Sequence, residues 1–376
     1  MPATEQSERY TLFLGSLPFP STESAMEEIM RRFGGSLYSL PDGECGEYAF
    51  SGAERSIRSN WITSAWWYMQ ETLAKERGLF RVVRPLDLDP REGVVTKPVP
   101  PQFKPTFRPH PDAVPDGLEF GYRSAFAQSY PAFLALREQW AQQDQCMGSI
   151  KFQIGVPTPL ALTLLALPGL DKLRYLQVFQ AALARECNAI IRQAGRENCI
   201  LQIEVPMEAN LAAKLPPLAD RWLCKSVTNL ASLLDAGTCV GVHVCMGDHN
   251  HQAMTPLTRL PRVISFVNRF ASARYWPAGR QLSYVHLGLA EGAIPPSTDH
   301  DRYAALSELR LPQGTRFVAG FIHEGRTVEE LLAIRGLVEH SVGNRVDMAY
   351  SCGLGRLKYE VAQAVLKKTE LLLAAS

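Results

Sequence analysis

The chain has 376 residues, of which 46% are hydrophobic, so it can bury a large core. Its 39 basic and 38 acidic residues give a net charge of +1 with no basic block, which argues against nucleic acid and acidic membrane surfaces as partners. Neither a secretory signal nor a run of eighteen apolar residues that could span a membrane is present. The eight cysteines show no C-x-x-C spacing, which favours reduced thiols and a cytoplasmic location.

Short apolar runs, each followed by turn residues and then a helical pattern, predict eight strands. These are residues 10–15, 36–40, 150–156, 200–205, 239–245, 282–288, 316–322 and 346–351. The helical patterns are residues 24–33, 53–76, 158–194, 209–236, 260–272, 300–309, 327–340 and 357–374. Eight alternating units predict an α/β fold, a closed (β/α)8 TIM barrel that occupies residues 1–376 as a single domain. An open doubly wound sheet is the alternative, weakened because no G-x-G-x-x-G follows a strand.

A barrel of this type needs about 250 residues, so we expect an insertion between the second and third strands, at about residues 84–147. The first half of this segment is rich in proline, which rules out a continuous helix or a central strand. The second half, residues 123–142, has a helical pattern. We expect the proline-rich part to form an ordered excursion over the barrel mouth or a partly mobile lid.

The fifth predicted strand ends in a candidate metal-binding pair. His243 and Cys245 are two residues apart, so their side chains project to the same side of a strand. Imidazole and thiolate are ligands that zinc favours, and zinc needs more than two. A second thiol, Cys352, follows the eighth predicted strand. The alternative for this set is a core histidine beside buried free cysteines.

Polar residues at the carboxyl ends of barrel strands are candidates for an active site. In this sequence they are Ser16, Asp42, Glu44, Arg58, Trp61, Glu204, Asp248, His286, Glu291, His323 and Arg356. Each also has an ordinary interpretation, since serine caps turns, Asp-Gly is a common turn pair and a strand-end carboxylate is often solvated. We expect His249, His251 and His323 to face solvent or the core rather than a metal.

These motifs together resemble the catalytic barrel of cobalamin-independent methionine synthase, in a superfamily that also includes uroporphyrinogen decarboxylase. The pair His243 and Cys245 and the ending CGLGR from Cys352 are similar to two parts of that barrel's zinc site. Residues 15–18, GSLP, resemble its GSxP first strand. Residues 202–206, QIEVP, resemble its IQxDEP strand, whose acidic residue binds the substrate's amino group. The matches occur in order from residue 10 to about residue 356.

The sequence also departs from the synthase pattern. The synthase has a second, amino-terminal barrel, for which this chain is too short. Its third zinc ligand is a glutamate at the end of the sixth strand, where this sequence has His286, with Glu291 five residues later. The segments LPDGE, SYPAF, FQIGVPTP, HVCMGD and CGLGR are closer to an uncharacterised single-barrel branch of the family.

The resemblance implies a zinc-dependent methyltransferase or alkyltransferase that acts on a small thiol, with the zinc-bound thiolate as the nucleophile. The implied metal ligands are His243, Cys245, Cys352 and His286, with Glu291 as the alternative to His286. The implied substrate-binding residues are Ser16, Asp42, Glu44, Arg58, Trp61 and Glu204, and the implied catalytic residues are Glu204, Asp248 and His286. Asp248 or His286 would protonate the leaving group. A methylated folate is a candidate donor, with Trp61 or Trp66 as a shelf for its ring.

Three other functions compete with this interpretation. A zinc-dependent lyase or hydrolase on the same barrel would cleave a C–S or related bond. A metal-free decarboxylase of the uroporphyrinogen type would leave His243, Cys245 and Cys352 without a purpose. A purely structural zinc usually has four Cys or His ligands at short spacing, whereas these ligands are more than a hundred residues apart.

Overall fold

The computed structural model describes residues 8–45, 69, 80–84, 106–110, 118–248, 251–257 and 259–375, without the side chains of residues 145 and 146. Each of the eight predicted strands has a counterpart: β1 (Thr11–Leu12), β2 (Ser39–Pro41), β5 (Lys151–Pro157), β6 (Cys199–Glu204), β7 (Cys239–Val244), β8 (Gln281–Gly288), β9 (Arg316–Ile322) and β10 (Asp347–Tyr350). They form one parallel sheet in the order β1-β10-β9-β8-β7-β6-β5-β2. A parallel bridge between Thr11 and Leu37 joins β1 to the segment before β2, so the barrel is nearly closed. The predicted (β/α)8 barrel is therefore confirmed.

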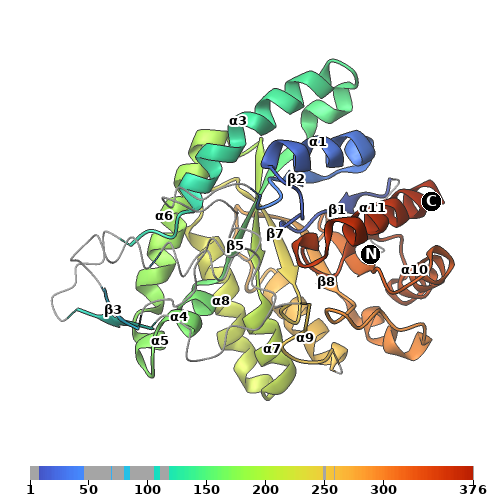
Figure 1. The fold of residues 1–376 in the computed structure, drawn as a ribbon. Coiled ribbons are helices and arrows are strands. Elements are labelled where there is room, and N and C mark those ends of the chain that lie inside the picture. Colours follow the sequence, from blue (N-terminus) through green and yellow to red (C-terminus); the bar gives the residue numbers. More distant parts are fainter. Residues whose placement is uncertain are drawn as a thin grey trace.

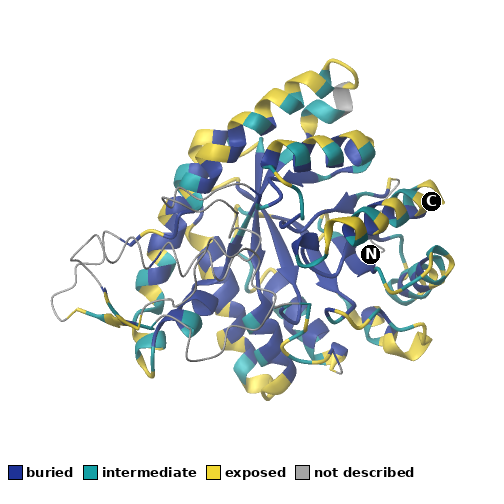
Figure 2. Cartoon of the chain, in the orientation of Figure 1, coloured by how far each residue is buried: buried dark blue, intermediate teal, exposed yellow. Residues whose placement is uncertain are grey.

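Helices surround the strands, as Figure 1 shows. They are α1 (Thr22–Phe33), α3 (Tyr122–Ala141), α4 (Pro159–Ala166), α5 (Asp171–Arg174), α6 (Leu176–Ala194), α7 (Pro206–Lys214), α8 (Asp220–Leu233), α9 (Leu260–Ala271), α10 (Val328–Val342) and α11 (Tyr359–Ala374). Figure 2 shows buried residues along the strands and the inner helix faces, and exposed residues on the outer faces. None of the described helices is long and apolar enough to cross a membrane.

Three of the predicted helices differ from those observed. The predicted helix 158–194 is divided into α4, α5 and α6: Pro168 and Gly169, the latter at φ 51°, separate α4 from α5, and Tyr175 at ψ 5° separates α5 from α6. The predicted helix 209–236 is likewise divided at Pro216 and Pro217. Residues 300–309 form two short 3₁₀ segments, His300–Arg302 and Ala304–Glu308, rather than an α-helix. Of the predicted helix 53–76, the structure describes Met69 alone.

Between β2 and β5 the chain adds elements that are not part of the barrel sheet. Strands β3 (Phe80–Arg84) and β4 (Thr106–Pro109) form a separate antiparallel pair. Among the described residues between β2 and β5, no strand joins the barrel sheet, which agrees with the proline content of the segment. Helix α3 follows, close to the predicted range.

The start of α3 is anchored by a residue of another helix. Its N-cap, Gly121, has no side chain to cap it. The buried carboxylate of Glu186 on α6 instead accepts hydrogen bonds from the backbone N–H groups of Phe120 and, at 3.4 Å, Arg123. These bonds satisfy N–H groups that would otherwise have no partner at the helix start. Glu186 therefore fixes α3 against α6.

A polar layer crosses the barrel interior below the strand ends. Gln153 Nε2 donates to the carbonyl of Phe13 at 2.8 Å and to Gln202 Oε1 at 3.1 Å, and the hydroxyl of Tyr284 donates to the same oxygen at 2.9 Å. Position 241 must be glycine, because a Cβ there would overlap the Tyr284 ring. The layer supports Glu204, since Gln202 Nε2 also lies 3.3 Å from Glu204 Oε1.

Candidate metal centre and adjoining pocket

Two thiols and one imidazole converge at the carboxyl ends of the strands. His243 lies on β7, Cys245 follows it, and Cys352 follows β10. Their ligand atoms lie within 4.8 Å of one another, and all three side chains are buried. The predicted set His243, Cys245 and Cys352 is thus brought together by the fold.

The donor set fits zinc. Zn–S and Zn–N bonds of about 2.3 and 2.05 Å at a tetrahedral angle hold a sulfur and a nitrogen ligand roughly 3.6 Å apart. His243 Nε2 and Cys352 Sγ are 3.8 Å apart. The three side chains therefore hold a geometry that a single zinc ion could enter with small adjustments.

A chain of hydrogen bonds orients the imidazole of His243. Its Nδ1 lies 2.8 Å from Nδ1 of His286, and Nε2 of His286 lies 3.1 Å from the carbonyl oxygen of Tyr350. Because that carbonyl can only accept, His286 carries its proton on Nε2 and accepts from His243 through Nδ1. This arrangement leaves the lone pair of His243 Nε2 directed toward Cys352. Burial, with a contribution from His243, keeps the pKa of His286 well below its usual value, in agreement with a neutral ring.

The two thiols have different acidities. A hydrogen bond from Cys245, helped by the positive charge of Arg356, lowers the pKa of Cys352 well below its usual value, although burial opposes this. The same hydrogen bond, together with burial, raises the pKa of Cys245. Cys352 is therefore the first of the pair to become the thiolate that binds a metal.

Residues that follow β1 and β10 are linked across the barrel mouth. Arg356 donates to Ser16 Oγ at 2.9 Å and to the backbone carbonyl of Asp248 at 3.1 Å. A Cβ on Gly353 would collide with Ser16 Oγ, so the backbone approaches this hydroxyl closely. Ser16 and Arg356, both chosen from the sequence, thus lie beside the thiol of Cys352.

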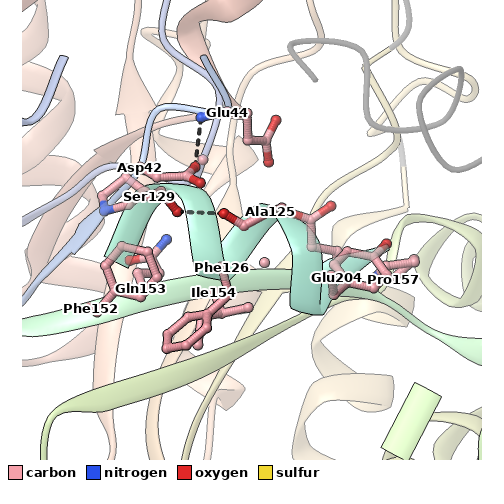
Figure 3. A pocket seen from close by; sticks show the side chains of 14 residues that line it. Asp42, Glu44, Ala125, Phe126, Ser129, Phe152, Gln153, Ile154, Pro157 and Glu204 are labelled. Carbon is pink, nitrogen blue, oxygen red and sulfur yellow. Dashed lines mark hydrogen bonds between the residues drawn. The ribbon is translucent and has the colours of Figure 1, made fainter. Parts of the chain in front are cut away.

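A pocket of about 610 Å³, including space open to solvent, lies next to the metal ligands. Helix α3 contributes Phe126 and Ser129 to its wall, and the carboxylates of Asp42, Glu44 and Glu204 also line it, as labelled in Figure 3. Glu204 connects pocket and metal centre, because it pairs in register with His243 on the neighbouring strand. Burial raises the pKa of Glu204, and the nearby His243 opposes this.

The turn that carries Asp42 and Glu44 is partly structural. Asp42 Oδ1 accepts a hydrogen bond of 2.8 Å from the backbone N–H of Glu44, which stabilises the turn at Gly43. The ordinary interpretation of the Asp-Gly pair therefore holds alongside its position in the pocket wall.

A second polar cluster joins the loops after β7, β8 and β9 to Tyr350, the last residue of β10. His251 Nε2 lies 2.6 Å from Glu324 Oε1, and the hydroxyl of Tyr350 donates to Glu324 Oε2 at 2.6 Å. Both ring nitrogens of His323 are in use: Nε2 lies 2.8 Å from the carbonyl of Gly292, and Nδ1 accepts from the Gly325 N–H at 3.0 Å. His323 therefore has no free lone pair for a metal.

Charge within this cluster is concentrated on one ion pair. The carboxylates of Asp248 and Glu324 raise the pKa of His251 to about 9. Although burial acts in the opposite direction, hydrogen bonds from His251 and Tyr350 lower the pKa of Glu324 to about 2. The expectation that His251 faces solvent is wrong in part, because the loop folds it onto Glu324.

Not every predicted residue belongs to a described part of the chain. Arg58, Trp61, Trp66 and His249 lie outside the described residues. Glu291 is half-buried and is bridged through its backbone to Ile294. Residues not predicted for the site are the pocket wall of α3 and the partners Tyr350 and Glu324. The sequence marks these two residues only by position, because Tyr350 lies at the end of the strand before Cys352 and Glu324 follows another strand.

No family model matches the chain, and a comparison with curated proteins finds no match. Among solved structures, a B12-independent methionine synthase from Shewanella sp. W3-18-1 in complex with selenomethionine matches with a TM-score of 0.55 at 12% identity, over 98% of this chain and 97% of that chain. A putative vitamin-B12 independent methionine synthase from Listeria monocytogenes gives a TM-score of 0.43 at 13% identity, over 99% and 98% of the two chains. A methyltransferase from Methanosarcina mazei gives 0.38 at 14% identity, over 65% and 63%.

The first of these structures has the fold that the family resemblance implies. At 12% identity the first of these likenesses establishes a shared fold.

Proposed function

We propose that this protein is a zinc-dependent methyltransferase or alkyltransferase that acts on a small thiol. The observation that carries the proposal is the buried triad of His243, Cys245 and Cys352 at the carboxyl ends of barrel strands, beside a pocket lined with carboxylates. The likeness in fold to methionine synthase-like proteins supports it.

Three protein ligands would leave one position of a tetrahedral ion free, as in catalytic rather than structural zinc sites. Zinc bound there would supply a place where a thiol loses its proton and is held as a thiolate. Arg356 and Ser16 border this place, and Glu204 lies on the neighbouring strand.

We assign His286 a different role from the fourth ligand implied by the family resemblance. Both of its ring nitrogens have partners, His243 Nδ1 and the Tyr350 carbonyl. We infer that His286 holds His243 in the tautomer that can bind metal, a role that outer-shell partners of metal-bound histidines commonly have. Glu291 remains the alternative fourth ligand.

The pocket favours a substrate that carries a positive charge. Asp42, Glu44 and Glu204 present carboxylates around it, and the family resemblance gives the position of Glu204 to binding of an amino group. We propose that these residues and Ser16 orient the polar end of the thiol substrate. Roles for Arg58 and Trp61 in the opposite wall, and a methylated folate as donor, rest on the resemblance alone.

A leaving group that departs with an electron pair needs a proton. Of the two predicted donors, His286 has both nitrogens engaged, which favours Asp248. Both carboxylate oxygens of Asp248 are buried and have no hydrogen-bond partner among the described residues.

A zinc-dependent lyase or hydrolase would use the same triad, so the products must separate it from a transferase. Incubation with a thiol and an alkyl donor should yield a thioether if the protein is a transferase, whereas a lyase or hydrolase should release a new thiol or acid.

We also propose that residues 1–376 form a single barrel domain. We propose the cytoplasm as the compartment of the protein, because the triad requires reduced thiols.

Metal analysis tests the proposal. Protein purified without chelator should contain one zinc per chain, and X-ray absorption at zinc should report two sulfur ligands and one imidazole. After cobalt substitution, titration with a panel of thiols should intensify the cobalt–thiolate absorption for the substrate class. A chain that takes up neither zinc nor cobalt would sink the metal hypothesis and favour a metal-free decarboxylase.

A further inference from the structure

We propose that Asp248 and His251 form a second cation site, separate from the triad, that binds a divalent ion of the manganese class. Its protein ligands would be a carboxylate oxygen of Asp248 and Nδ1 of His251, so an ion bound here would replace the proton-donor role proposed above for Asp248. The remaining positions would be taken by water or by a substrate oxygen.

The first observation is a group of buried polar atoms without partners. The side chain of Asp248 is 5% exposed, and neither of its oxygens has a hydrogen-bond partner among the described residues. The same holds for Nδ1 of His251. Buried carboxylates are strongly disfavoured unless they are paired or coordinate a metal, and the ion pair of Asp248 with His251 is long, at 3.9 Å, so a cation between the two side chains would stabilise them.

The spacing of these atoms suits an ion between them. Asp248 Oδ2 and His251 Nδ1 are 3.9 Å apart, which is too far for a hydrogen bond. An ion at about 2.1–2.3 Å from each of two ligand atoms holds those atoms roughly 3–4.5 Å apart. One carboxylate, one imidazole and water are a donor set that favours Mn²⁺ over thiol-seeking ions.

The second ring nitrogen of His251 has a partner that would support metal binding by the first. His251 Nε2 lies 2.6 Å from Glu324 Oε1, so it donates its proton there and leaves Nδ1 free to bind. Glu324 is itself held by Tyr350 at 2.6 Å. A carboxylate that fixes the tautomer of a histidine is the usual outer shell of a metal-binding imidazole.

The backbone fixes both ligands in advance. Asp248 forms a bridge with Ala253, and the carbonyl of His251 accepts from the Ala293 N–H at 2.9 Å. His251 has φ 62°, a left-handed conformation that is uncommon for a residue other than glycine and is typical of functional sites.

Nearby cations do not take the place of the ion. Arg356 donates to the backbone carbonyl of Asp248, and Lys368 donates to that of Glu324, so both use main-chain oxygens. Among the described residues, the side chain of Asp248 forms its ion pair with His251.

A proton competes with the ion for Nδ1. Asp248 and Glu324 raise the pKa of His251 to about 9, and burial opposes them. Below that pH each bound ion must release one proton, so the affinity should rise about tenfold per pH unit up to about pH 9.

Manganese titration of the zinc-loaded protein tests the site. Electron paramagnetic resonance of free Mn²⁺ should show one ion bound per chain, with an affinity that increases from pH 7 to pH 8.5. Asp248→Asn and His251→Gln should abolish this binding, and Glu324→Gln should weaken it about 10- to 100-fold. Far-ultraviolet circular dichroism should confirm that each variant is folded.

A surface Asp–His pair provides the matched control. Asp301 Oδ1 lies 3.5 Å from His300 Nδ1, and both side chains are exposed. Asp301→Asn should therefore leave Mn²⁺ binding unchanged. The variant Cys352→Ser should retain the manganese site, which separates this proposal from that of the zinc triad. No stoichiometric Mn²⁺, or binding that survives both Asp248→Asn and His251→Gln, would overturn the proposal in favour of a proton that remains on His251.

Discussion

Replacing His286 by leucine tests its assignment as the hydrogen-bond acceptor of His243. The change fills the buried position on β8 with an apolar side chain. It removes His286 Nδ1, the acceptor that lies 2.8 Å from His243 Nδ1. His243 must then bury an unpaired Nδ1–H, or move its proton to Nε2 and lose the lone pair that faces Cys352.

The size of the effect follows from this unpaired donor. A buried N–H without a partner costs about 1–3 kcal/mol. At about 1.4 kcal/mol per factor of ten, zinc affinity should fall by roughly 5- to 150-fold. His286→Gln supplies an amide oxygen to accept from His243 and an N–H group for the Tyr350 carbonyl, so it should recover most of the affinity.

The assay is competition with a chromophoric chelator for zinc, run on the wild type and both variants. An affinity of His286→Leu equal to that of the wild type would refute the reasoning. So would a wild-type X-ray absorption spectrum with two imidazole ligands, or a loss in His286→Leu as large as that in Cys352→Ser, because each outcome would make His286 a direct ligand.

Three further predictions concern other parts of the molecule. Cys352→Ser should remove bound zinc and activity while the circular dichroism spectrum stays that of the wild type; full zinc occupancy would exclude Cys352 from the site. Glu204→Gln should raise KM for an amine-bearing thiol by at least tenfold with little change for a thiol that lacks the amine, and equal effects on both thiols would count against binding of the amine. Burial raises the pKa of Glu186 from 4.5 to about 7, so its contribution to stability is complete below pH 4.5 and is lost as the pH rises through 7. Relative to Glu186→Gln, the wild-type free energy of unfolding in urea should therefore fall by roughly 2–3 kcal/mol between pH 5 and pH 8, and parallel pH profiles would contradict this.

The strands and the metal triad could be predicted because they depend on short-range patterns. The two-residue spacing of His243 and Cys245 determines that they share a side of β7, and a thiol after the last strand must reach the same end of the barrel. Helix boundaries failed where Pro-Gly and Pro-Pro pairs divide long apolar runs.

The role of His286 could not be predicted from a short-range sequence pattern. Its orientation depends on the register between β7 and β8, which places it opposite His243, and on the Tyr350 carbonyl two strands away. Likewise, the pairing of His251 with Glu324 arises from two loops that meet in space but have no pattern in common. The position of the α3 wall of the pocket depends on Glu186, which belongs to none of the motifs recognised in the sequence.

The extent of strand pairing differs around the circumference of the barrel. Strands β7 to β10 are paired with their neighbours along several residues each, whereas β1 meets the segment before β2 through the single bridge of Thr11 and Leu37. Amide hydrogens along this seam should exchange with solvent sooner than those of β7 and β8, because fewer bonds must open. Ser16 and Asp42 follow the two strands that flank the seam, so the substrate side of the mouth is the more flexible part, while the imidazole of His243 stays on a firmly paired strand. A bound ligand that contacts both sides of the seam would then hold β1 and β2 together. Slower amide hydrogen exchange in these two strands would report on binding independently of catalysis.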